Sequence, residues 1–202
     1  MIKLFFNPRS TFSRRVHIAL LEKQIPFEPI LIDMAVREHK SEAHLSRNPY
    51  GRVPAIDDAG FMLYESASIL LYLEATHPQP PLVPADAQGR ALVDMHMRLC
   101  DLQFARHAGT IIFPRRFLPP ERWDHAAMDV ARREMELHLA ILAAQLDNAA
   151  YLVRDAFSLA DIAYLPMLHF IPLMDLELAP NLAAWRDRLL ARPSAIATIP
   201  DR

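Results

Sequence analysis

The sequence predicts an α/β domain at the N-terminal end, followed by an all-helical domain. Three observations support this fold class. Short apolar runs alternate with helical patterns over residues 1–77, a Pro-rich segment interrupts the chain at 78–85, and only helical patterns follow. Pro-rich segments are stiff and extended. We therefore expect domains at 1–77 and 86–202 with a linker at 78–85.

The first elements predict a parallel pair of strands. An apolar run at 2–6 ends at Asn7-Pro8 and reads as a buried strand. Apolar residues then recur at helical spacing up to residue 23. A second strand is expected at 27–32, at a sheet edge because it contains Pro29. Strand, helix and strand in this order form a βαβ unit with parallel strands.

The remaining N-terminal elements complete the α/β domain. A short irregular helix is expected at 41–46, and a strand opens at Val53-Pro54. The turn signal at 57–60 leads into another strand at Phe61, and a helix is expected at 66–76. The resulting order, βαβαββα, is the thioredoxin-like arrangement.

Glu65 and Ser66 stand where this last helix begins. The pattern predicts that Ser66 caps the helix and that Glu65 lies beside its positive end. Free backbone amides, a hydroxyl and a carboxylate would then converge at one helix N-terminus. Such a site suits a small zwitterion, whose carboxylate the amides bind and whose ammonium Glu65 binds.

These motifs resemble a known family. VPAI, a short turn and ESASILLYL are similar to the glutathione-binding half of the cytosolic glutathione S-transferases, and the resemblance extends over nearly the whole chain. It implies a cis Pro54 and a γ-glutamyl group held by Glu65 and Ser66. It also implies that the backbone of Val53 pairs with the cysteinyl unit of glutathione.

The turn before the first helix contains the catalytic candidate. The stretch N-P-R-S-T-F-S-R-R-V resembles the serine-type transferases of the tau, phi, theta and zeta kinds, and places Ser10 on their serine. A hydroxyl at a helix N-terminus can donate a hydrogen bond that favours the thiolate of glutathione. Taken alone, Ser10 could equally be a plain helix cap, and Thr11 and Ser13 compete for both roles. The Glu65-Ser66 pattern downstream favours Ser10 as the thiolate donor.

Position 12 separates this sequence from two related groups. It is Phe, and the N-terminal domain contains no cysteine, which argues against the cysteine-type relatives that form mixed disulfides. The same residue departs from the Ser-Ser-Cys signature of the zeta kind. This departure weakens a maleylacetoacetate isomerase interpretation.

The glycine carboxylate of glutathione requires a cation. The theta-like pattern has a histidine at the position of His39 and a basic residue at that of Arg52, and Lys40 is a neighbouring competitor. The alternative is that all three are solvated loop charges.

The second domain is predicted to be helical throughout. Helical patterns run over 86–113, 128–146 and 181–191, and the last of these contains Trp185. Ser158 and Asp161 form a capping-box pair before a helix that is apolar on all sides and contains Pro166. We interpret this box as a folding element.

Composition narrows the function classes. The net charge of -2 offers no basic surface for nucleic acid, and the nine histidines have no metal-ligand spacing. The single cysteine, Cys100, excludes a disulfide within the chain and indicates a reducing compartment. The stretch MIKLFFNPRS has too short an apolar run for a secretory signal, and the sequence has no 18-residue apolar stretch, so we expect a cytoplasmic protein without a membrane partner.

The predicted activity is glutathione S-transfer to a small hydrophobic electrophile. The resemblance implies glutathione as co-substrate, no metal, and a homodimer. Glutathione-dependent isomerase, ether cleavage or dehalogenation on the same site remain alternatives, as does a non-catalytic binding protein of this fold.

Overall fold

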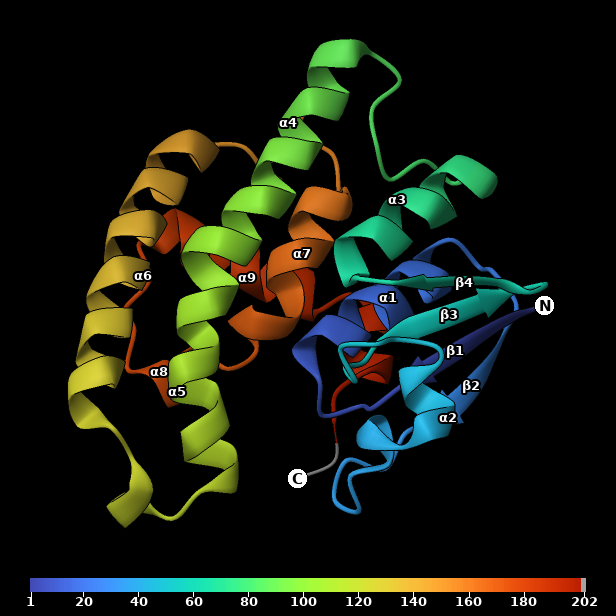
Figure 1. Cartoon of the computed structure of the whole chain (residues 1–202). Helices are drawn as coiled ribbons and strands as arrows, with labels where there is room; N and C mark the ends of the chain where they lie inside the picture. The colour runs from blue at the N-terminus through green and yellow to red at the C-terminus, as the bar shows by residue number, and fades with distance from the viewer. Residues whose placement is uncertain (201–202) are drawn as a thin grey trace. The chain divides into compact units, whose positions relative to one another are not determined.

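The computed structural model describes residues 1–200, and these residues form two compact units. The first unit contains residues 1–82 and 193–200, and the second contains 83–192. The helical domain expected at 86–202 differs from the second unit at its C-terminal end, because residues 193–200 belong to the first unit. Figure 1 labels the strands of the first unit and most helices of both units.

The first unit is built on a four-stranded mixed sheet, which confirms the thioredoxin-like prediction. The strand order is β2-β1-β3-β4, with β1 parallel to β2 and antiparallel to β3. Pro29 lies in the edge strand β2, as expected for a residue without an N–H. The strands are β1 (Ile2–Phe6), β2 (Phe27–Leu31), β3 (Ala55–Asp58) and β4 (Phe61–Tyr64).

Helices α1 (Thr11–Glu22) and α3 (Ser66–Thr76) contact each other, and α3 also contacts β3 and β4. Between β2 and β3 lie the 3₁₀ turn η1 (Glu38–Lys40) and the short helix α2 (Glu42–Leu45). The turn after β3 has the expected form: the Gly60 N–H donates to Asp57 Oδ1 at 2.8 Å. Gly60 has a φ of 93°, which glycine adopts without strain.

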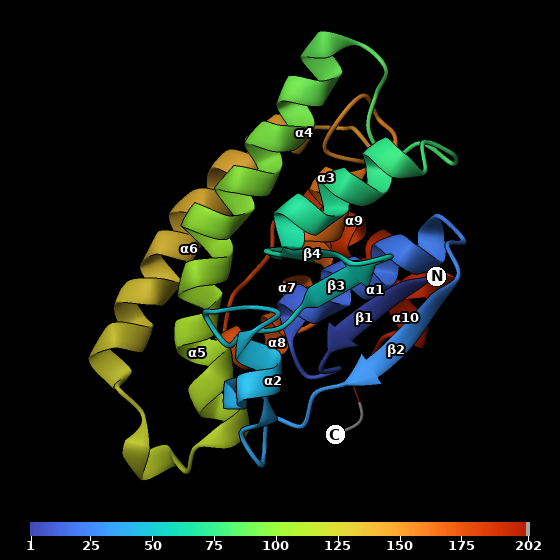
Figure 2. The ribbon, with the colours of Figure 1, turned by 45° about the vertical axis from the view of Figure 1, so that its right-hand side comes forward.

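Two contacts complete the first unit. Helix α10 (Pro193–Ala197) packs against α1, and its Ser194 hydroxyl donates to Glu22. Figure 2 labels α10 just below α1. The buried Lys23 donates to Glu74 at 2.6 Å and to the Pro80 carbonyl at 2.8 Å. These bonds tie the Pro-rich segment to the first unit as far as Leu82, where the unit ends.

The second unit is helical, as predicted. The stretch expected as one helix from 86 to 113 is interrupted by a π-helical segment, η2 (Cys100–Ala105), and continues to Phe117. Its other elements are α4 (Ala87–Leu99), α5 (Arg106–Phe117), η3 (Pro120–Arg122), α6 (His125–Leu146), α7 (Leu159–Leu168), α8 (Ile171–Met174) and α9 (Pro180–Leu190).

The predicted capping box is present at the start of α7. Asp161 Oδ2 accepts from the N–H of Ser158 at 2.9 Å, and its Oδ1 accepts from Trp185 Nε1 at 2.9 Å and the Leu152 N–H at 3.2 Å. Trp185 is fully buried. Burial raises the pKa of the Asp161 carboxyl, while these hydrogen bonds oppose the rise. The box therefore joins α7 to α9 and to the preceding loop.

Within residues 1–200, every helix is too short or too polar to cross a lipid bilayer.

Candidate active site

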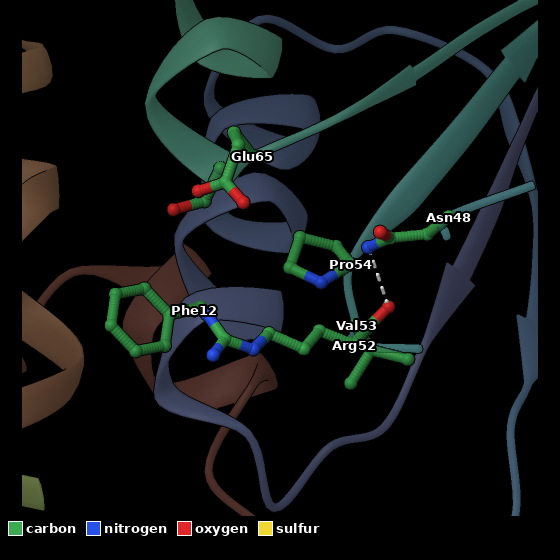
Figure 3. A pocket seen from close by; sticks show the side chains of 7 residues that line it. Phe12, Asn48, Arg52, Val53, Pro54 and Glu65 are labelled. Atoms are coloured by element: carbon green, nitrogen blue, oxygen red, sulfur yellow. Dashed lines mark hydrogen bonds between the residues drawn. The ribbon is translucent and has the colours of Figure 1, made fainter. Parts of the chain in front are cut away.

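A pocket in the first unit gathers residues from three separate segments (Figure 3). They come from the start of α1, the loop between α2 and β3, and the start of α3. The lining residues are Phe12, Asn48, Arg52, Val53, Pro54, Glu65 and Ser66. Four of the predicted glutathione-binding residues, Arg52, Val53, Glu65 and Ser66, are thus brought together.

Helix α3 begins without a side-chain cap. Glu65 occupies the cap position with a φ of 71°, and Ser66 is the first helical residue. The prediction that Ser66 caps this helix is therefore wrong, because the cap position precedes it. The first amides of α3 consequently lack the side-chain acceptor that a capped helix supplies. They remain available to an anion in the pocket.

The hydroxyl of Ser66 accepts a hydrogen bond from a buried arginine. Arg15, which is buried, donates from Nη1 to Ser66 Oγ at 3.3 Å. The same guanidinium lies 4.8 Å from the centre of the Phe12 ring. Arg15 therefore links the two helix starts that border the pocket, in a way that sequence spacing did not predict.

Ser10 caps α1. Its Oγ accepts from the Ser13 N–H at 3.2 Å, so the hydroxyl hydrogen of Ser10 remains able to donate. Ser10 is not one of the residues that line the pocket, although Phe12, two residues further on, is. Its competitor Ser13 is fully buried, and its Oγ accepts from the Asn7 N–H at 3.3 Å.

The loop before β3 carries Arg52 and Val53 into the pocket. The Val53–Pro54 peptide is cis, as the family resemblance implied. Figure 3 shows the Arg52 side chain extended across the pocket toward Phe12. The Arg52 carbonyl accepts from Asn48 Nδ2 at 3.0 Å and from His44 Nε2 at 2.9 Å.

His39 and Lys40 lie on η1, outside the lining of this pocket. Lys40 Nζ donates to the Tyr50 carbonyl at 3.0 Å and has further hydrogens to donate. Desolvation, followed by the positive charge of Lys40, lowers the pKa of His39 below its ordinary value. The lowered pKa favours the neutral imidazole, which can bind a carboxylate through its ring N–H.

Sequence reasoning missed two lining residues. Phe12 was noted only because it is not a cysteine, and Asn48 was part of a helix-breaking Asn-Pro pair. An Asn before Pro in a loop is a general turn signal. The sequence therefore carried no sign that Asn48 is buried, 1% exposed, with its amide bonded to the pocket loop.

The pocket offers matched partners for a peptide-like ligand. Unpaired amides at α3 suit a carboxylate, and the exposed Glu65 carboxylate suits an ammonium. Arg52 supplies an exposed guanidinium for a second carboxylate. No group of three His, Cys, Asp or Glu side chains over residues 1–200 is arranged to hold a metal ion.

Comparison with known proteins identifies the family. The family described as "Glutathione S-transferase, N-terminal domain" matches residues 4–81, and "Glutathione S-transferase, C-terminal domain" matches residues 104–193. A glutathione S-transferase of Silene vulgaris is 31% identical over 212 aligned residues, covering 96% of this chain and 94% of that protein.

Solved structures that are similar to this chain are also glutathione transferases. Glutathione transferase F2 of Populus trichocarpa superimposes with a TM-score of 0.89 at 27% identity, covering 98% of this chain and 97% of that one. A glutathione transferase of Burkholderia graminis, solved with two glutathione molecules bound per subunit, gives a TM-score of 0.88 at 26% identity over 100% of this chain and 89% of that one. The chain therefore belongs to the glutathione S-transferase family and is a glutathione transferase.

Proposed function

We propose that Ser10 holds glutathione as the thiolate and that this thiolate attacks a small hydrophobic electrophile. The observation that supports the proposal is that the first unit contains both an uncapped helix start, at α3, and a helix start capped by a serine, at α1. The first arrangement suits the γ-glutamyl end of glutathione, and the second suits its sulfur.

In the proposed pose, the γ-glutamyl carboxylate lies at the first amides of α3 and at the Ser66 hydroxyl. The ammonium pairs with Glu65, and the Val53 backbone pairs with the cysteinyl unit. Arg52 and Lys40 supply charge for the glycine carboxylate, and His39 adds a neutral N–H.

The chemistry needs little more than an ionised sulfur. A free thiol with a pKa of about 8.5 is only a few per cent thiolate at pH 7. The Ser10 hydroxyl already accepts a backbone N–H, which leaves its hydrogen to donate to sulfur. The α1 N-terminus adds a favourable field. The thiolate then forms a C–S bond, the leaving group departs with its electron pair, and the thiol proton passes to solvent.

The proposed electrophile is apolar and small. Phe12 borders the pocket with 39% of its surface exposed, which offers an aromatic face beside the bound sulfur.

Conjugation kinetics test the mechanism. Wild type and Ser10→Ala are compared with an aryl halide, and the bound thiol is titrated through its thiolate absorbance. We expect Ser10→Ala to raise the pKa of bound glutathione and to lower kcat/KM. Thr11→Ala is the matched control. Equal activity and equal thiol pKa in wild type and Ser10→Ala would remove Ser10 from the mechanism.

We also propose a cytoplasmic homodimer. Tyr50, Phe61 and Leu71 of the first unit are 63%, 49% and 42% exposed, and an interface between two copies of the chain would cover apolar side chains of this kind. Light scattering should give twice the 23.0 kDa of one chain. Tyr50→Glu should shift the mass toward the monomer, and fractionation of cells tests the compartment.

A further inference from the structure

Two buried side chains hold the peptide unit between Arg52 and Val53. Its carbonyl oxygen accepts from His44 Nε2 at 2.9 Å and from Asn48 Nδ2 at 3.0 Å. His44 is 0% exposed and Asn48 is 1% exposed. A carbonyl oxygen has two lone pairs. Both are therefore occupied by donors that water cannot replace, which fixes the orientation of this peptide plane.

The partners assign the orientation of both side chains. A carbonyl only accepts, so Nε2 of His44 carries the hydrogen. Asn48 Oδ1 accepts from the Tyr50 N–H at 3.1 Å, which leaves its Nδ2 for the carbonyl. The other ring nitrogen of His44 is buried without a hydrogen-bond partner within residues 1–200. Burying an unpaired ring nitrogen disfavours folding, so packing alone does not explain a histidine here.

The clamped carbonyl directs the neighbouring amide. The Arg52–Val53 peptide is not among the cis bonds of the chain, and in a trans peptide the C=O and N–H point in opposite directions. With its carbonyl turned toward α2, the unit turns the Val53 N–H away from α2. Val53 lines the pocket, and its N–H donates to no residue in the described part of the chain.

We infer that His44 and Asn48 are positioning residues for the glutathione transferase reaction. By holding the Arg52 carbonyl, they aim the Val53 N–H at the cysteinyl carbonyl of glutathione. They thereby set the distance between the glutathione sulfur and the N-terminus of α1. This inference rests on the proposed glutathione pose, because it assigns the Val53 N–H to that ligand.

The first test uses two amide variants that differ by one methylene. His44→Gln carries its NH₂ where Nε2 stands, and His44→Asn carries it where Nδ1 stands, out of reach of the carbonyl. The probe is S-methylglutathione, which cannot ionise at sulfur and so reports binding without thiolate formation. Calorimetry should show a Kd about tenfold higher for His44→Asn. His44→Gln should stay within about threefold of wild type, as expected for a retained donor.

A second variant covers the outcome in which His44→Asn does not fold. Asn48→Asp keeps the acceptor for the Tyr50 N–H but removes the donor to the Arg52 carbonyl, and it should also raise the Kd. The control is Lys23→Met, which removes a buried donor from the Pro80 carbonyl away from the pocket. It should lower Tm and leave the Kd unchanged.

The outcomes separate this inference from the proposed function. If wild type binds S-methylglutathione and neither His44→Asn nor Asn48→Asp weakens binding, the positioning role is overturned and the proposed function stands. A Lys23→Met variant that weakens binding equally would also overturn it, since general destabilisation would then explain the loss. If wild type does not bind the probe at all, both the pose and the inference fail.

Discussion

Helices α3 and α7 begin in opposite ways, although each starts with a serine and an acidic residue. At α7, Ser158 and Asp161 satisfy each other and the surrounding donors, and both are buried. At α3, Glu65 holds a positive φ, caps nothing with its side chain, and is exposed to the pocket. We call the capped start of α7, at Ser158 and Asp161, the closed start, and the uncapped start of α3, at Glu65 and Ser66, the open start. The closed start stabilises the fold, whereas the open start leaves its backbone amides available to a ligand.

The largest expected effect falls on the closed start. Asp161→Ala leaves Trp185 Nε1 and the Leu152 and Ser158 N–H groups without their acceptor. We expect the free energy of unfolding to fall by about 4 kcal/mol in urea denaturation. Glutathione affinity of the folded fraction should not change. The exposed Asp187→Ala is the control, and a loss no larger than in that variant would contradict the folding role.

The next effect falls on catalysis. Ser10→Ala should lower kcat/KM by about 100-fold, because a shift of roughly two units in the thiol pKa corresponds to ~2.7 kcal/mol. The lost cap of α1 should lower stability by about 1 kcal/mol. Conjugation rates and urea denaturation measure the two effects separately. A variant that loses stability but no activity would leave Ser10 as a cap alone.

A pH-dependent effect is expected in the second unit. Desolvation, followed by the charge of His96, lowers the pKa of the buried His138 to about 4. In the unfolded chain the imidazole titrates near ~6.5, so the unfolded state binds more protons between these values. The stability that neutral His138 contributes is therefore present above pH 6.5 and is lost as pH falls toward 4, with about 2 kcal/mol lost by pH 5.

The control for this pH effect is His138→Gln, which keeps a polar partner for the Tyr164 hydroxyl, 3.0 Å from His138 Nε2. Glutamine does not titrate in this range. The stability of the variant should depend less steeply on pH, as measured by urea denaturation at several pH values. Equal slopes in the two proteins would assign the acid sensitivity to other groups.

A smaller effect is expected on binding at the open start. Glu65→Gln removes the charge proposed for the ammonium and should raise the glutathione Kd about tenfold, or ~1.4 kcal/mol. Calorimetry measures it, with Glu28→Gln on the exposed edge strand as the control. If both variants bind as wild type does, the γ-glutamyl ammonium lies elsewhere.

The smallest effect is a gain in stability. Glu65 has a φ of 71°, a conformation that glycine adopts freely and glutamate does not. Glu65→Gly should therefore raise the free energy of unfolding by about 1 kcal/mol while weakening glutathione binding. Glu28→Gly, in a strand, should instead lower stability. A less stable Glu65→Gly would show that the open start stores no strain.

The sequence predicted much of the fold because its motifs are local. The turn at 57–60, the apolar strands and the Ser158–Asp161 box each depend on residues close together in the chain, so spacing and turn chemistry were sufficient. The cap of α3 was misplaced by one residue. The positive φ at Glu65 is imposed by the surrounding structure, and no local sequence propensity predicts it.

The amino-acid sequence alone determined the fold class and the family resemblance. It also assigned Glu65 and Ser66, together with Val53-Pro54, to one glutathione-binding motif. Only the tertiary structure decided that Arg15 reaches Ser66 across 51 positions of sequence, and that His44 and Asn48 hold one carbonyl. The physical reason is burial. A polar side chain becomes a strong positional constraint only where water is excluded, and that exclusion is a property of packed elements rather than of neighbouring residues.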